Sequence, residues 1–154
     1  MSDEHAFDER HIGETPLVEL PVDVPATVYA KVEWLNLHRA AHGGGSIKSR
    51  IAVGMLDRAE QRGDLTPDQT VLEPSSGNTG SELARLATAR GYEVEIVMPD
   101  DAAVGKVEAV EDAGATVHFV DAERGYDATL ERCEDLVEAN PGRYYWPNQY
   151  ENSD

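Results

Sequence analysis

The sequence predicts an α/β fold, in which a parallel β-sheet carries helices on both faces in a three-layer αβα arrangement. Short apolar runs alternate with helical patterns from about residue 46 to residue 148. Gly91 and Gly114 stand where two of these helices should end. One apolar run leads through small residues directly into a helical pattern. This regular alternation is typical of β-α units whose strands lie parallel in one sheet.

The N-terminal part has a different pattern. Residues 1–12 are polar and acidic and indicate a flexible arm. Residues 16–20 and 27–33 are strand-like, and two prolines between them favour a hairpin or a loop. We therefore expect a hairpin and loop over 13–45 and a cofactor- and substrate-binding α/β domain over 46–150.

The α/β part is predicted to begin with a helix over 46–62. Ser46 is a suitable N-cap, and Gly63 follows as a stop. Later strands are predicted at 70–73, 93–98, 116–120 and 143–146, and later helices at 80–90, 104–113 and 126–139.

Residues 73–80, Glu-Pro-Ser-Ser-Gly-Asn-Thr-Gly, connect a predicted strand to a predicted helix. Such a turn presents backbone N–H groups at the positive end of a helix dipole, which favours binding of an anion. In parallel sheets, ligands bind at the carboxyl ends of strands, where this loop lies. Upstream, Lys48 follows a glycine run at the start of the helix predicted over 46–62. A lysine near an anion site indicates carbonyl or phosphate chemistry.

The composition limits the choice of partners. The 154 residues carry a formal net charge of −17, which argues against binding nucleic acid or an anionic membrane. The acidic residues are spread along the chain and lysine is scarce, a composition that indicates a halophilic protein, adapted to high salt. The single cysteine, Cys133, fits a reducing compartment and is expected to be a helix residue. No apolar run has membrane length, so a cytoplasmic protein is expected.

These segments, in this order, resemble the fold-type II pyridoxal-phosphate enzymes, specifically the cysteine synthase and cystathionine β-synthase family. The resemblance extends from Gly13 to the last residue. It is strongest in the Ser-Gly-Asn-Thr-Gly block and in the Ser-x-Lys at 46–48. The matching segments are 13–18, 31–36, 46–52, 73–80, 98–100, 114–115 and 147–152.

The resemblance implies a role for each matched residue. Lys48 would form an imine with the aldehyde of pyridoxal 5'-phosphate and would later remove the substrate's α-proton. Asn78 would donate a hydrogen bond to the cofactor's 3′-oxygen. The residues that would bind the carboxylate of a small amino-acid substrate are Ser75, Ser76, Gly77, Thr79 and Gln149. Plainer interpretations remain open: a solvent-facing lysine, a left-handed turn at Asn78, and ordinary helix capping by the hydroxyl residues.

The chain departs from the family in three places. Ser49 replaces an acidic residue that usually follows the lysine, and Lys106 lies in a segment that often carries Glu-Arg. The connection before Ser46 is longer and contains His38 and His42, whose spacing suits a metal on a helix. With no third ligand nearby, no metal site is predicted.

The resemblance implies β-replacement, in which an activated serine and a sulfide or thiol give cysteine or a related amino acid. Two alternatives remain open: a dehydratase-type lyase that uses the same cofactor, and an inactive fragment or partner subunit. Family members are about twice as long, and their phosphate-binding loop lies in the second half. We therefore expect this chain to be an N-terminal half from a family whose full-length members form homodimers. A companion C-terminal chain is a candidate partner.

The predicted hairpin is expected to pack, in the family, on the larger domain that this chain lacks. In the chain alone its apolar side chains should be poorly covered. They are Leu17, Val18, Leu20, Val28, Tyr29 and Val32.

Overall fold

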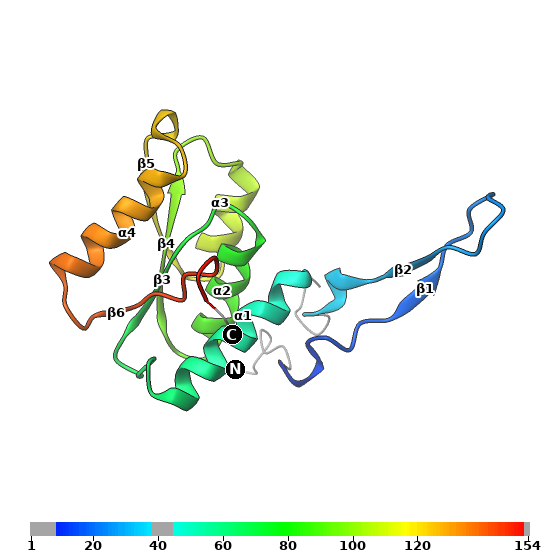
Figure 1. Ribbon diagram of the computed structural model, residues 1–154, viewed down its shortest axis with the longest axis horizontal. Coiled ribbons are helices and arrows are strands. Elements are labelled where there is room, and N and C mark those ends of the chain that lie inside the picture. Colours follow the sequence, from blue (N-terminus) through cyan, green and yellow to red (C-terminus); the bar gives the residue numbers. More distant parts are fainter. Residues whose placement is uncertain (1–8, 38–44, 153–154) are drawn as a thin grey trace. The chain divides into compact units, whose positions relative to one another are not determined.

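The computed structural model describes residues 9–37 and 45–152. The chain divides into two compact units, residues 1–50 and 51–154, which are described separately below (Figure 1). His38 and His42 lie outside the described residues, as does most of the segment predicted to be an arm.

The first unit contains the predicted hairpin. Strands β1 (Leu17–Glu19) and β2 (Tyr29–Lys31) pair antiparallel, with Val18 opposite Ala30. Both strands are shorter than the sequence pattern suggested, and the proline-containing segment between them forms the loop. Two short 3-10 helices flank the hairpin, η1 (Glu9–His11) and η2 (Glu33–Leu35).

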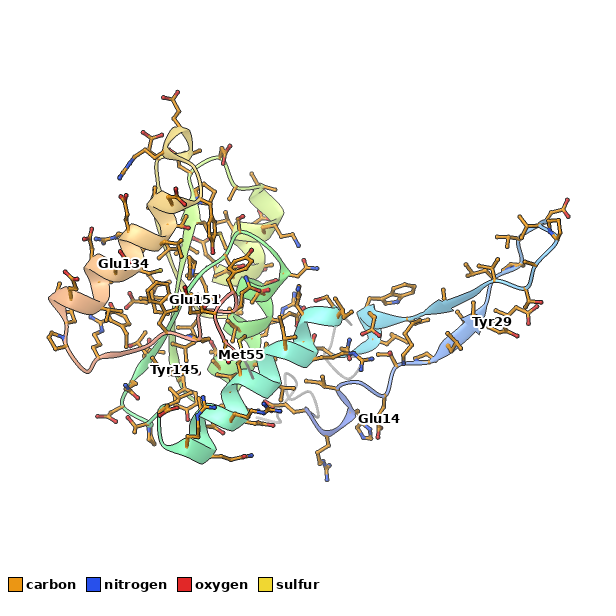
Figure 2. The ribbon with its side chains drawn as sticks, in the orientation of Figure 1. Glu14, Tyr29, Met55, Glu134, Tyr145 and Glu151 are labelled. Atoms are coloured by element: carbon orange, nitrogen blue, oxygen red, sulfur yellow. The ribbon has the colours of Figure 1, made fainter. Side chains whose placement is uncertain are left out.

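Most of the hairpin's apolar side chains are exposed, as predicted. Leu17 is 63% exposed and Tyr29 55% exposed, and Tyr29 stands out from the strand in Figure 2. Val18 and Leu20 are also exposed, and Val28 is half-buried. The expectation was wrong for Val32, which follows β2 and is only 5% exposed.

The second unit is built on a four-stranded parallel sheet with the strand order β5-β4-β3-β6, which confirms the predicted fold class. Helix α1 (Ile47–Arg62) has its first residues in the first unit and the remainder in the second. The other bounds are β3 (Thr70–Pro74), α2 (Asn78–Ala89), β4 (Glu93–Pro99), α3 (Val104–Glu111), β5 (Thr116–Val120), η3 (Ala122–Arg124), α4 (Asp127–Ala139) and β6 (Tyr144–Tyr145).

Helices cover both faces of this sheet. Helix α4 lies on one face, and α2 and α3 lie on the other (Figure 1). The core between α4 and the sheet contains Leu72, Val97 and, from α4 itself, Cys133, all fully buried, so Cys133 is a buried helix residue as expected. Among the described residues, no helix is both long enough and apolar enough to span a membrane.

Glycine ends helices where the sequence predicted it. Gly91 follows α2 with φ 92°, and Gly114 follows α3 with φ 88°. A positive φ strains any residue that has a Cβ atom, so glycine is favoured at these positions. These stops set the short connections that return the chain to the next parallel strand.

Candidate active site

The motif at 73–80 lies at the carboxyl end of β3, as predicted, and leads into α2. Ser75 organises this turn. Its Oγ accepts hydrogen bonds from the N–H of Gly77 (3.3 Å) and of Gly80 (3.0 Å). Two of the loop's N–H groups are therefore already satisfied by Ser75, which is itself buried. This arrangement is the capping role that the sequence left open for the serine.

Gly80 is required by close packing, a role that the sequence analysis did not assign. A Cβ atom at this position would lie 2.7 Å from the carbonyl oxygen of Ser75 and 3.3 Å from Ile96 Cγ2. Neither the Ser75 backbone nor the buried Ile96 side chain can move away without a substantial cost in free energy. The glycine thus allows the first turn of α2 to approach the end of β3.

Two predicted substrate-binding residues meet although they are distant in sequence. Thr79 Oγ1 donates a hydrogen bond to Gln149 Oε1 at 2.7 Å. Thr79 is buried in the first turn of α2, whereas Gln149 is half-buried in the segment after β6. The remaining residues of the predicted loop, Ser76 and Gly77, are exposed beside them.

Asn78 is the first residue of α2, and its side chain is held by a cation. Lys106 Nζ, from the first turn of α3, donates to Asn78 Oδ1. The oxygen of the amide is thereby engaged, and its NH₂ group remains as a donor. The left-handed alternative for Asn78 was wrong, because Asn148 is the only non-glycine residue with positive φ among those described.

Glu73, the penultimate residue of β3, is a fully buried carboxylate just before the loop. It accepts hydrogen bonds from the N–H of Asn148 (2.9 Å) and of Gln149 (3.2 Å). Burial raises the pKa of Glu73 from 4.5 to about 7, although both N–H donors act in the opposite direction. The sequence analysis gave Glu73 no role of its own. A carboxylate that continues the apolar pair Val71-Leu72 was the available signal.

In the first unit, the first turn of α1 positions Lys48. Ser46 Oγ accepts from the N–H of Lys48 (3.0 Å), which confirms Ser46 as the N-cap. Ser49 Oγ accepts in return from the N–H of Ser46 (3.1 Å). The two serines form a reciprocal cap of the kind in which a side chain three residues inside the helix satisfies the N-cap N–H. Ser49 can thus cap the helix without the charge of the acidic residue it replaces.

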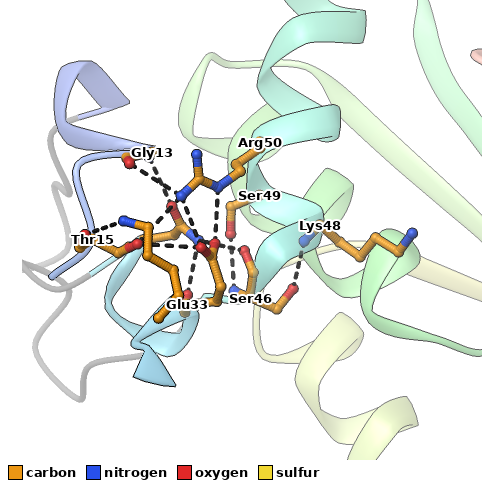
Figure 3. A network of polar contacts seen from close by, with 9 residues as sticks. Gly13, Thr15, Glu33, Ser46, Lys48, Ser49 and Arg50 are labelled. Carbon is orange, nitrogen blue, oxygen red and sulfur yellow. Dashed lines mark hydrogen bonds and ion pairs between the residues drawn. The ribbon is translucent and has the colours of Figure 1, made fainter. Parts of the chain in front are cut away.

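Lys48 differs from the other two lysines in its side-chain contacts. Lys31 Nζ donates to the carbonyl oxygen of Thr15, and Lys106 Nζ donates to Asn78. Within the described part of its own unit, Lys48 Nζ makes no hydrogen bond or ion pair, and its side chain points away from the neighbouring polar network (Figure 3). An amine that is not engaged in an ion pair is a suitable nucleophile towards an aldehyde.

That neighbouring network is centred on Arg50 and Glu33 (Figure 3). Arg50 Nε donates to Glu33 Oε2 (2.9 Å), and Nη2 donates to Oε1 (2.8 Å), a bidentate arrangement. Hydrogen bonds from Arg50, and then from Asn36, lower the pKa of Glu33 from 4.5 to about 2. Arg50 Nη2 also donates to the carbonyl oxygen of Gly13 (3.1 Å). Three segments that carry the family resemblance therefore meet next to the turn that bears Lys48.

Residues 9–154 match the family described as "Pyridoxal-phosphate dependent enzyme", and the chain belongs to this family of enzymes. The chain is 37% identical over 143 residues to the cysteine synthase of Flavobacterium sp.. It is 38% identical over 145 residues to the probable cysteine synthase of Bacillus subtilis. In both comparisons 92% of this chain is covered, but only 44% of the relative, so the chain spans less than half of their length.

A solved structure gives the same result. The hydrogen sulfide-producing enzyme from Fusobacterium nucleatum superposes with a TM-score of 0.81 at 34% sequence identity. The match covers 93% of this chain and 45% of the Fusobacterium chain. Enzymes of the family use pyridoxal phosphate, which agrees with the cofactor expected from the sequence.

Proposed function

We propose that this chain is the N-terminal part of a β-replacement enzyme of the cysteine synthase type. Such an enzyme joins an activated serine to a sulfide or thiol and gives cysteine or a related amino acid. The observation that carries the proposal is the contact between Thr79 and Gln149 at the start of α2, beside Asn78. The family resemblance assigned Thr79 and Gln149 independently to binding of the substrate carboxylate, and this contact brings the two side chains together.

The residues present fit the part of the cofactor that reacts. Lys48 offers an amine with no polar partner among the described residues of its own unit. Asn78 offers its side-chain NH₂ group, because its side-chain oxygen already accepts from Lys106. When bound, pyridoxal phosphate supplies an electron sink. Lys48 would hold its aldehyde carbon, and Asn78 would donate to a ring oxygen. We assign no described residue to the cofactor's phosphate.

The substrate's carboxylate would be bound at the N-terminal end of α2. The first N–H groups of a helix have no intrahelical partner, and the helix dipole favours an anion there. Thr79 and Gln149 would add a hydroxyl and an amide, while Ser76 and Gly77 would border the site. Lys48, as a free amine, would accept the proton from the substrate's α-carbon.

Reduction with borohydride in the presence of pyridoxal phosphate tests the central assignment. Peptide mapping should find the reduced adduct on Lys48, and Lys48→Ala should remove it, while the matched control Lys31→Ala should retain it. An adduct on Lys31 or Lys106 in the wild-type chain would contradict the assignment. Product analysis with and without sulfide, in an assembled enzyme, then separates β-replacement from a dehydratase-type elimination.

A companion-subunit function is favoured by one further observation. The hairpin's exposed apolar side chains, with Leu17 63% and Tyr29 55% exposed, are suited to packing against another protein surface. We propose that a C-terminal half, in the same polypeptide or in a separate chain, covers them and supplies the phosphate site. The complete enzyme is then proposed to be a cytoplasmic homodimer.

We also propose that the protein is adapted to high salt. Its formal net charge of −17 and the rarity of lysine support this. Dense surface carboxylates repel one another, and salt screens that repulsion.

A further inference from the structure

Glu73 is buried without a cation. Its carboxylate has no ion pair among the described residues, and its two hydrogen bonds come from backbone N–H groups. By contrast, the buried carboxylate of Glu95 is paired with Arg143 and His118. An ionisable group buried without a charged partner is costly, so a carboxylate at this position needs a specific reason.

The donors to Glu73 are the N–H groups of two consecutive residues, Asn148 and Gln149. Asn148 has φ 48°, a left-handed conformation that turns the chain so that neighbouring N–H groups converge. Converging N–H groups form a concavity that favours an anion. An ionised carboxylate can accept both hydrogen bonds, whereas a glutamine side chain has one accepting atom and one donating group.

The turn held by Glu73 carries the substrate contact. The backbone N–H of Gln149 donates a hydrogen bond to the Glu73 carboxylate, and the side-chain Oε1 of Gln149 accepts one from Thr79 at 2.7 Å. One continuous path therefore runs from the end of β3, through the turn after β6, to the first turn of α2. Loss of the Glu73 contacts would release Gln149 from Thr79.

We propose that Glu73 is a positioning residue, whose ionised carboxylate fixes the turn at 147–151 so that Gln149 stays beside Thr79 at the substrate's carboxylate site. The part of this proposal that concerns substrate rests on the proposed function. The part that concerns the turn depends only on the contacts of Glu73.

The charged and titratable groups around Glu73 allow a clean measurement. Tyr126 and Cys133, from the α4 side, interact electrostatically with Glu73, and burial raises the pKa of each to about 12. Both are therefore neutral between pH 5 and 9. Glu151, in the turn itself, is exposed and contacts the Asn148 side chain (Oε2 to Nδ2, 3.2 Å). It provides a matched control, because Glu151→Gln removes a carboxylate from the same turn.

The first experiment is a pH titration of the 154-residue chain, followed by ¹⁵N NMR between pH 5 and 9. In the wild type, the backbone amide resonances of Asn148 and Gln149 should move in one step with a midpoint near neutrality. Glu73→Gln should abolish that step and shift the Gln149 side-chain NH₂ resonances, while Glu151→Gln should preserve both. If the side-chain carboxyl carbon of Glu73 titrates in the wild type but the Asn148 and Gln149 amide resonances do not move with it, the proposal is overturned even if Glu73→Gln does not fold.

The second experiment separates this inference from the proposed function. L-serine is titrated into the wild type and both variants, and the resonances of Thr79 and Gln149 are followed. We expect binding about tenfold weaker in Glu73→Gln than in the wild type or Glu151→Gln. Equal affinity in Glu73→Gln overturns the inference and leaves the proposed function intact. A wild type in which neither Thr79 nor Gln149 responds to serine counts against the proposed function, whereas the pH step still decides the role of Glu73 in the turn.

Discussion

Glu33 and Glu73 have the same side chain, yet their pKa values move in opposite directions. Arg50 and Asn36 stabilise the ionised form of Glu33 and lower its pKa to about 2. Among the described residues, buried Glu73 receives hydrogen bonds only from backbone N–H groups, and burial raises its pKa to about 7. The partner that each carboxylate meets therefore decides its charge, and the two residues should respond to pH in opposite ways.

Replacement of Glu73 should change how stability depends on pH. Because its native pKa is raised above 4.5, the native state binds more protons than the unfolded state between pH 4.5 and 7. The wild type should therefore lose unfolding free energy relative to Glu73→Gln as pH rises from 5 to 7, by roughly 1 kcal/mol per pH unit, and then level off. Urea unfolding of both chains at pH 5, 6, 7 and 8 measures this difference. A difference that does not vary with pH would contradict the prediction.

Arg50 should stabilise the first unit through Glu33. The native pKa of Glu33 is depressed, so its contribution is present above pH 4.5 and is lost as pH falls through about 2. Arg50→Gln should therefore speed hydrogen exchange at Gly13 and in the first turn of α1 at pH 7. The control Arg62→Gln, which breaks the exposed pair with Asp64, should leave those amides unchanged. Equal protection of these amides from exchange in Arg50→Gln and Arg62→Gln would show that the Arg50–Glu33 ion pair does not stabilise this region.

At the scale of elements, local pattern was sufficient for most of the fold. The strand at 116–120 and the helix stops at Gly91 and Gly114 were predicted correctly, since periodicity and glycine act within a few residues. The contacts of Glu73 with 148–149 and of Asn78 with Lys106 could not be predicted. They depend on β6 lying beside β3 and on the placement of α3, which no local pattern specifies.

The β3–α2 turn should be intolerant of a single added methyl group. Gly80→Ala places a Cβ atom 2.7 Å from the carbonyl oxygen of Ser75, so we expect a loss of about 1–3 kcal/mol of unfolding free energy. The matched control is Gly105→Ala in the first turn of α3, where a Cβ atom meets nothing within 4 Å. That variant should be neutral or more stable by up to about 1 kcal/mol. Thermal unfolding of both chains tests this, and an equally stable Gly80→Ala would contradict the packing argument.

For the whole molecule, charge should control stability. A formal net charge of −17 on 154 residues produces self-repulsion that dissolved ions screen. The melting temperature should rise markedly from tens of millimolar to molar potassium chloride. Calorimetry across that range is the measurement, and a constant melting temperature would remove the argument for adaptation to high salt.

The isolated chain should also associate through its hairpin and be catalytically silent. Strands β1 and β2 pair with each other, and their exposed apolar side chains and open edges favour contacts with other chains. The double variant Leu17→Ser and Tyr29→Ser should reduce association in sedimentation experiments. Val104→Ser, at a position that is 71% exposed on the second unit, is the control and should not.

Co-expression with the C-terminal half of a related enzyme should strengthen the weak cofactor binding of the isolated chain and restore turnover. Substantial β-replacement activity of the purified 154-residue chain alone would show that the second half is dispensable.

The reactivity of Cys133 can be used to measure local opening of α4. It is the only cysteine, it is a fully buried residue of α4 that packs with Leu72 and Val97, and burial raises the pKa of its thiol to about 12. A thiol in that state reacts with alkylating reagents only when the helix lifts from the sheet. The rate of modification therefore measures the free energy of that local opening under native conditions. The same protection leaves a silent background, on which one introduced surface cysteine could carry a spectroscopic label.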